Sequence, residues 1–196
     1  VHFNLAIECF YLNAFEKFWN KVERGFLVDF KSSGKTIYAY GEYLSEGDYY
    51  LASVADIFFL HPAGSLEFNG LMANITFFKG LFEKLEIQPE IFRVGAFKSA
   101  VEPYLRKNMS SENRFQYTSL LNDIYDIYLN DVSLSRDIQK GNLSKYSKEL
   151  QVQVPEDAYR LKLVDSLGYK DELKSLIAAD LGIEEISDIN FISFQN

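Results

Sequence analysis

The chain has 196 residues, which is the size of one sizeable domain. Its content of 47% hydrophobic and 24% charged residues is that of a folded globular protein and excludes an intrinsically disordered chain. A formal net charge of −8 argues against nucleic acid as a partner, because phosphate binding requires clustered lysine and arginine.

Aromatic residues make up 16% of the chain, with 17 Phe and 13 Tyr. Such rings fill a core, or they line a subunit interface or a groove for apolar ligands. The single cysteine, Cys9, cannot form an internal disulfide and is expected to be a small core residue. No apolar run is long enough to cross a bilayer. Because the chain begins without methionine inside a strand-like run, we expect a fragment of a longer protein.

The first part of the chain predicts a strand–helix–strand unit. A strand over residues 3–12 is followed by Asn13 and Glu16, a capping-box pattern that opens a helix. The apolar side chains of this helix recur at helical spacing, at Phe15, Phe18, Trp19, Val22, Phe26 and Phe30. Gly34 ends the helix, and residues 35–40 form a second strand. Units of this kind build parallel sheets with right-handed crossovers.

Ser45 has two possible roles. With Asp48 it forms a second capping box, which opens a short helix over residues 49–52. In the functional interpretation Ser45 is a nucleophile on a strand-to-helix turn. In the structural interpretation its hydroxyl accepts hydrogen bonds from backbone N–H groups of the first turn, and the pattern favours this second role.

The remaining elements alternate between extended segments and helices. Extended segments are predicted at residues 56–60 (stopping at His61-Pro62), 64–70, 89–94 and 189–194. Helices are predicted at residues 77–85, 111–138, 155–167 and 171–181, while the polar residues 143–151 are expected to be irregular. The sequence therefore predicts one α/β domain over residues 1–196. Strands and helices mix in residues 1–110, residues 111–182 are mainly helical, and residues 183–196 are a terminal extended segment.

The segment 94–103 is the strongest candidate for chemistry. Gly95 ends the predicted strand, and Lys98 then lies between Phe97 and the small residue Ser99. A lysine held against an aromatic ring loses hydration, which lowers its pKa and yields a neutral amine that can act as a base. The alternative is a solvated loop lysine with an ordinary pKa. The spacing of these residues alone favours the alternative.

Other chemistries lack their motifs. The two histidines, His2 and His61, are too few and too isolated for a metal site. No G-x-S-x-G nucleophile elbow, glycine-rich dinucleotide loop or phosphate-binding P-loop occurs in the sequence. We therefore expect no metal and no cofactor. An enzyme built on this chain needs a lysine, a tyrosine or a carboxylate as its base, which points back to Lys98.

Three sequence blocks carry a family resemblance. They are residues 38–43 (Tyr-Ala-Tyr-Gly-Glu-Tyr), the Ser45–Asp56 block and the Phe92–Pro103 block, continued by Met109-Ser110 and Leu163-Val164-Asp165. Over roughly residues 35–194 the chain resembles the N-terminal domain of the long, tandem-domain form of the signal peptide peptidase A (protease IV) family. The block around Lys98 is the most specific, whereas the Leu-Val-Asp block is shared with many crotonase-like and Clp-protease-like domains.

The resemblance implies a ClpP/crotonase-type fold, in which ββα units wind into a superhelix. It makes Lys98 the general base of a Ser–Lys dyad whose serine belongs to a second, downstream domain, since Ser45 does not match the family's nucleophile position. The isolated chain would then be inactive. The implied substrates are signal peptides or other apolar peptides. The resemblance places the protein on the non-cytoplasmic side of a bacterial inner membrane. It also implies a homo-oligomer, specifically a tetramer.

Two further functions stay open at this point. One is a non-catalytic ClpP/crotonase-like packing and oligomerisation domain, which the missing serine and the abundant aromatic residues favour. The other is a crotonase-like enzyme of acyl-group chemistry with a backbone oxyanion hole, although no CoA-binding feature is visible in the sequence.

Overall fold

The computed structural model describes residues 5–8, 19–90 and 99–190. Its contacts divide the chain into two compact units, the first formed by residues 1–70 and 128–196 and the second by residues 71–127. The single domain expected from the sequence stays a prediction, because two compact units of one chain can fold together or apart.

The first unit holds the sheet, whose strands are β1 (Leu5–Glu8), β2 (Ile37–Leu44), β3 (Ile57–Leu66) and β4 (Ser166–Leu167). Its helices are α1 (Trp19–Ser32), α2 (Glu46–Ala52), α6 (Lys140–Lys148), α7 (Pro155–Arg160), α8 (Lys170–Leu181) and the 3-10 helix η3 (Ile186–Asp188). The second unit contains α3 (Lys79–Lys84), the 3-10 helix η2 (Ser99–Val101) and α4 (Glu102–Leu105). Helix α5 (Ser111–Arg136) contributes residues to both units.

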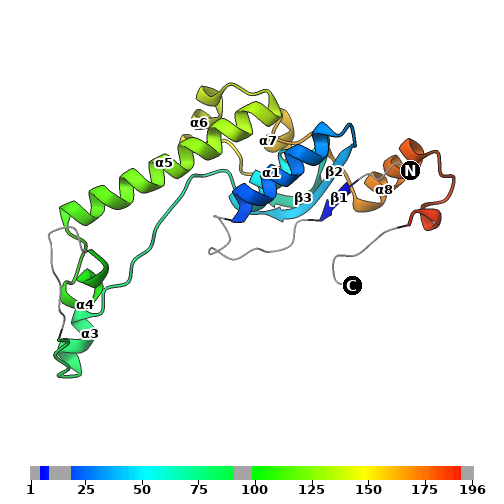
Figure 1. Cartoon of the computed structure of the whole chain (residues 1–196). Coiled ribbons are helices and arrows are strands. Elements are labelled where there is room, and N and C mark those ends of the chain that lie inside the picture. Colours follow the sequence, from blue (N-terminus) through cyan, green and yellow to red (C-terminus); the bar gives the residue numbers. More distant parts are fainter. Residues whose placement is uncertain (1–4, 9–18, 91–98, 191–196) are drawn as a thin grey trace. The chain divides into compact units, whose positions relative to one another are not determined.

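The strands that the structure describes are all parallel and lie in the order β1-β2-β3-β4 (Figure 1). Ile7, Ala39 and Phe58 align across the first three strands. Because the order in the sheet follows the order in the chain, each crossover adds the next strand beside the last one. Helices α1 and α2 separate the first three strands, so this part of the sheet is built by β-α-β steps. The predicted α/β fold class with a helical C-terminal half is confirmed.

Helices cover both faces of the sheet. Alternate residues of a strand point to opposite faces, and residues 37–41 of β2 are all buried. On one face Tyr38 packs with Leu173 of α8. On the other face the ring of Phe58 lies against that of Tyr49 from α2, with centroids 5.9 Å apart. Burial on both faces is typical of parallel sheets.

Two aspartates lock successive strands together. Asp56, just before β3, accepts a hydrogen bond from the backbone N–H of Ile37 at 2.9 Å. Asp165, just before β4, accepts one from the backbone N–H of Phe58 at 2.8 Å. Its carboxylate also binds the Arg136 guanidinium at 2.6 and 3.1 Å. The Leu-Val-Asp block therefore has a structural role, because it ties α5 to the sheet.

The strand predicted over residues 56–60 does not stop at Pro62, so that boundary was wrong. As β3 it continues to Leu66, which joins it to the start of the second predicted extended segment. The pairing with β2 shifts register here, and Glu42 alone stands opposite residues 61–64. A proline is tolerated at such an irregularity, because its missing N–H is not required by the ladder.

Two predictions in the C-terminal half were also wrong. Residues 143–151 were expected to be irregular but lie largely in α6, where the fully buried Leu143 fixes the helix while most of its polar neighbours stay accessible. The helix predicted over 155–167 is the shorter α7. It ends early because Lys162 adopts a left-handed φ of 61°, and residues 166–167 then pair with β3 as β4.

Some predictions concern residues outside those described. They are the strand ends at 3–4 and 9–12, the capping box of Asn13 and Glu16, the core role of Cys9, and the extended residues 91–94 and 191–194. Within the described ranges, no helix combines the length and the apolar character needed to span a bilayer.

Candidate functional site

Lys98, the predicted base, lies outside the residues that the structure describes. The described chain resumes at residue 99 with η2, which leads directly into α4. Pro103 lies in the first turn of α4, where its fixed φ suits a helix and an N–H is not needed. The end of the Lys98 block is therefore a short helical turn.

Glu102 anchors this turn to the start of α5. Its carboxylate accepts hydrogen bonds from the Ser110 backbone N–H at 3.0 Å, the Ser110 hydroxyl at 2.5 Å and the Asn113 side-chain amide at 3.0 Å. The Ser110 hydroxyl in turn accepts the backbone N–H of Asn113 at 3.1 Å, which caps α5. Glu102 and Asn113 are only 7% and 2% exposed. This cluster fixes the chain that follows Lys98 to a 26-residue helix.

The hydrogen bonds of Glu102 predict that the protein loses stability at acidic pH. Burial raises the pKa of the Glu102 carboxyl, but the hydrogen bonds from Ser110 and Asn113 outweigh burial and hold that pKa below its usual value. The pKa of this carboxyl is lower in the folded protein than in the unfolded chain, where it is near 4.5. The ionised carboxylate therefore stabilises the fold at pH values above 4.5, and this stabilisation is lost as the pH falls through the folded pKa. Wild type should therefore exceed Glu102→Gln in free energy of unfolding at neutral pH, and this difference should shrink below pH 4.5.

Urea unfolding of both proteins across this pH range measures the difference. Glu86→Gln is a matched control, because Glu86 is an exposed carboxylate of the same unit. It removes one exposed charge from the same unit without touching the Glu102 hydrogen bonds. A Glu102→Gln difference that does not change with pH would contradict the role assigned to the carboxylate.

An aromatic cluster packs α3 and α4 together. The rings of Phe78, Phe82 and Tyr104 stack pairwise with centroids 6.0 to 6.3 Å apart. The backbone N–H of Phe78 also donates to the carbonyl of Pro103 at 2.7 Å. Part of the cluster faces solvent, since Phe78 and Tyr104 are 37% and 44% exposed, and Leu81 on α3 is 51% exposed. Phe78, Leu81 and Tyr104 thus form an exposed apolar surface at α3 and α4.

Ser45 acts as a helix cap, as the sequence predicted. Its hydroxyl accepts the backbone N–H of Asp48 at 3.2 Å and donates to the Asp48 carboxylate at 2.7 Å. The same carboxylate accepts the backbone N–H of Ser45 at 2.9 Å, which completes the capping box of α2. The hydroxyl is therefore committed to the helix terminus, which argues against a role as nucleophile.

His61 has a structural role at the register shift of β3. Its Nδ1 accepts the backbone N–H of Ala63 at 3.0 Å, and its ring meets that of Tyr169 edge-on at 5.2 Å. His2 lies outside the described residues. Within the described part of the chain, no group of three or more His, Cys, Asp or Glu side chains could hold a metal ion.

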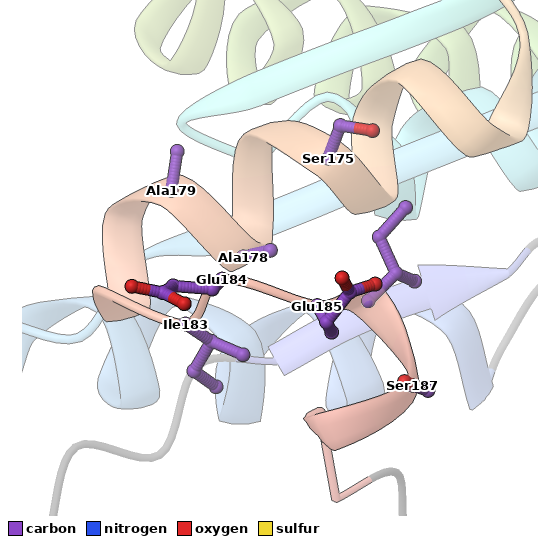
Figure 2. Close-up of a pocket in the computed structure, with 8 residues that line it drawn as sticks. Ser175, Ala178, Ala179, Ile183, Glu184, Glu185 and Ser187 are labelled. Carbon is purple, nitrogen blue, oxygen red and sulfur yellow. The ribbon is translucent and has the colours of Figure 1, made fainter.

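A surface hollow of about 460 Å³ lies between α8 and the segment that follows it (Figure 2). Its lining comprises Ser175, Ala178, Ala179, Ile183, Glu184, Glu185, Ile186 and Ser187. The two carboxylates belong to exposed residues, and none of the described lining residues is a lysine, histidine or cysteine. The described lining therefore offers no nucleophile paired with a base, so it does not point to an active site.

Sequence reasoning missed the role of Glu102, although the residue lies inside the Lys98 block. The available signal was an acidic residue directly before Pro103, since acids are favoured in the first turn of a helix. That signal predicts a solvated side chain near a helix start. The partners Ser110 and Asn113, which bury the carboxylate, belong to the next helix and could not be identified from spacing.

Residues 29–184 match the model of Peptidase family S49. Protease 4 of Haemophilus influenzae is 40% identical over 125 residues, which cover 64% of this chain and 20% of that protein. Protease 4 of Salmonella typhi is 39% identical over 117 residues, which cover 60% and 19%. The chloroplastic serine protease SPPA of Arabidopsis thaliana is 28% identical over 179 residues, which cover 90% and 26%. The chain thus spans about a fifth to a quarter of the length of these relatives.

Proposed function

The chain belongs to peptidase family S49, and from this premise we propose that it is the lysine-bearing half of a serine endopeptidase with a Ser–Lys dyad. Lys98 is the general base. The nucleophilic serine lies in a second catalytic domain of the same protein. The observation that carries the proposal is the family match over residues 29–184, which includes the whole Lys98 block.

The chemistry requires a neutral lysine. Its amine takes the proton of the serine hydroxyl, the alkoxide attacks the peptide carbonyl, and the resulting ammonium returns the proton to the leaving amine. This cycle runs near neutral pH only if the lysine pKa falls by several units, which loss of hydration supplies. Glu102 is a positioning residue for Lys98. It ties the chain just after Lys98 to the start of α5 through three hydrogen bonds.

The substrates are signal peptides or other apolar peptides. The apolar surface of Phe78, Leu81 and Tyr104 supports this choice, because it lies in the unit that carries the end of the Lys98 block. We further propose that the protein works on the non-cytoplasmic side of a bacterial inner membrane, as a homo-oligomer that is a tetramer. These two features rest on the family resemblance alone.

One experiment compares the activity of this chain alone with that of the longer protein that holds both residues of the dyad. The 196-residue chain should not hydrolyse an apolar reporter peptide, whereas the longer protein with its downstream domain should hydrolyse it. Ser45→Ala should leave the activity of the longer protein unchanged apart from a modest loss of stability, since the capping hydroxyl is worth about 1 kcal/mol. Robust hydrolysis by the 196-residue chain that Ser45→Ala abolishes would overturn the proposal.

A non-catalytic oligomerisation domain is the second candidate. The commitment of the Ser45 hydroxyl to a helix cap and the exposed apolar surface favour it. Under this alternative Lys98 has an ordinary pKa. An NMR titration of the Lys98 side chain in the longer protein distinguishes the two candidates, because the base of a dyad must titrate well below a solvated lysine.

A further inference from the structure

Glu46 is a buried carboxylate that the proposed dyad does not use. It is the first residue of α2 and is 6% exposed. A first-turn glutamate usually stays in solvent and interacts with the helix dipole. Here one oxygen, Oε1, instead accepts two backbone hydrogen bonds from a distant segment, from the N–H of Asn69 at 2.9 Å and of Gly70 at 2.7 Å.

The two N–H groups point at one oxygen because of the local backbone. Gly70 has a φ of 95°, a left-handed backbone conformation that residues other than glycine rarely adopt. Successive backbone N–H groups in such a turn form a concavity that binds anions. Because Asn69 is exposed, the concavity lies near solvent. We call the N–H groups of Asn69 and Gly70 the amide cradle.

The cradle is held by packing that does not involve Glu46. The preceding residue, Phe68, is 1% exposed, and its ring lies 5.8 Å from that of Tyr49 and 6.0 Å from that of Tyr128. One residue earlier, the backbone N–H of Glu67 donates to the carbonyl of Leu44 at 2.8 Å. The backbone that enters the cradle is therefore fixed to β2 and to the core. It should keep its geometry when the Glu46 carboxylate is removed.

We propose that the amide cradle is a carboxylate-binding site whose built-in occupant is the side chain of Glu46. While Glu46 fills it, the cradle is closed to any other anion, including a substrate carboxylate or a carbonyl oxygen that develops negative charge. Removal of the Glu46 carboxylate opens a site for a small free carboxylate such as acetate. The inference does not depend on the proposed dyad, and its test does not use peptidase activity.

The test is rescue of Glu46→Ala by acetate in the full chain. The substitution should lower the ratio of folded to unfolded protein, because two part-buried amides lose a charged acceptor. Acetate at about ten times its dissociation constant should then raise that ratio by roughly tenfold, since it binds only the folded state. Sodium chloride at equal ionic strength should not restore stability. Glu67→Ala, which removes a nearby exposed carboxylate, should not respond to acetate.

Glu46→Gln tests the same site when Glu46→Ala does not fold. The glutamine keeps the shape and a carbonyl acceptor but removes the charge. The amide proton resonances of Asn69 and Gly70 should both move upfield relative to wild type, because hydrogen bonds to a neutral acceptor are weaker. Unchanged resonances for both amides would overturn the proposal, as would a folded Glu46→Ala protein that acetate does not stabilise.

Discussion

Replacement of Lys98 by alanine is expected to lower the rate of peptide hydrolysis by the longer protein on the order of 10³-fold. The reason is that serine is a weak nucleophile until a neighbouring base removes its proton, and Lys98 is the proposed base of the dyad. Lys98→Arg should be equally inactive. Its guanidinium keeps the positive charge but does not lose a proton near neutral pH, so it cannot serve as a base.

The measurement compares initial rates on an apolar reporter peptide with thermal unfolding of the same samples. Lys107→Ala is the matched control, because Lys107 belongs to the same unit and forms an exposed ion pair with Glu83 at 2.6 Å. Its loss should cost little stability and no activity. If Lys98→Ala is folded and as active as Lys107→Ala, Lys98 is not the base.

The sequence predicted best those elements whose signals are local. Ser45 and Asp48 form the predicted capping box of α2, because both capping bonds join residues three apart, although the helix begins at Glu46 and not at residue 49. Helix α8 ends before Gly182, whose φ of 67° is the left-handed conformation that glycine provides at a helix end. In both cases the interaction that sets the boundary lies within a few residues of it.

Elements set by distant contacts were predicted poorly. Leu143 fixes α6 only because its side chain is fully buried in the folded first unit. Residues 166–167 leave the helical pattern because Phe59 and Leu60 of β3 offer them a strand to pair with. Spacing along the chain reports neither burial nor the identity of a pairing partner, so tertiary contacts overrode the local pattern.

The same limit applies to the buried charged residues. Lys98 could be named because a family motif surrounds it, although it lies outside the described residues. Glu46 and Glu102 are acids at helix starts, a position that normally places them in solvent, and their burial depends on amides and hydroxyls of later segments. A charge whose partners lie far along the chain cannot be distinguished from a solvated one by sequence pattern.

Arg24 is a buried charged residue whose partners lie far along the chain. Its replacement by alanine is expected to lower the free energy of unfolding by about 3–4 kcal/mol. Its side chain is 5% exposed. The guanidinium donates to the carbonyl of Tyr50, and it lies 4.5 Å from the centre of that ring. It also donates to Ser53 Oγ at 2.9 Å, to the Asp131 carbonyl at 2.9 Å and to Ser135 Oγ at 2.6 Å. One side chain therefore joins α1, α2 and α5.

The cost arises because alanine leaves these acceptors buried with fewer donors. Burial lowers the pKa of Arg24, while Tyr50 and Asp131 oppose that shift. Arg24→Lys keeps a charge but loses the fork of donors, so it should lose about half as much stability as Arg24→Ala. Lys31→Ala on the same helix should lose less than about 1 kcal/mol, because its ion pair with Asp56 is partly solvated. Urea unfolding measures all three variants. Equal losses for Arg24→Ala and Lys31→Ala would show that the Arg24 network does not hold the three helices together.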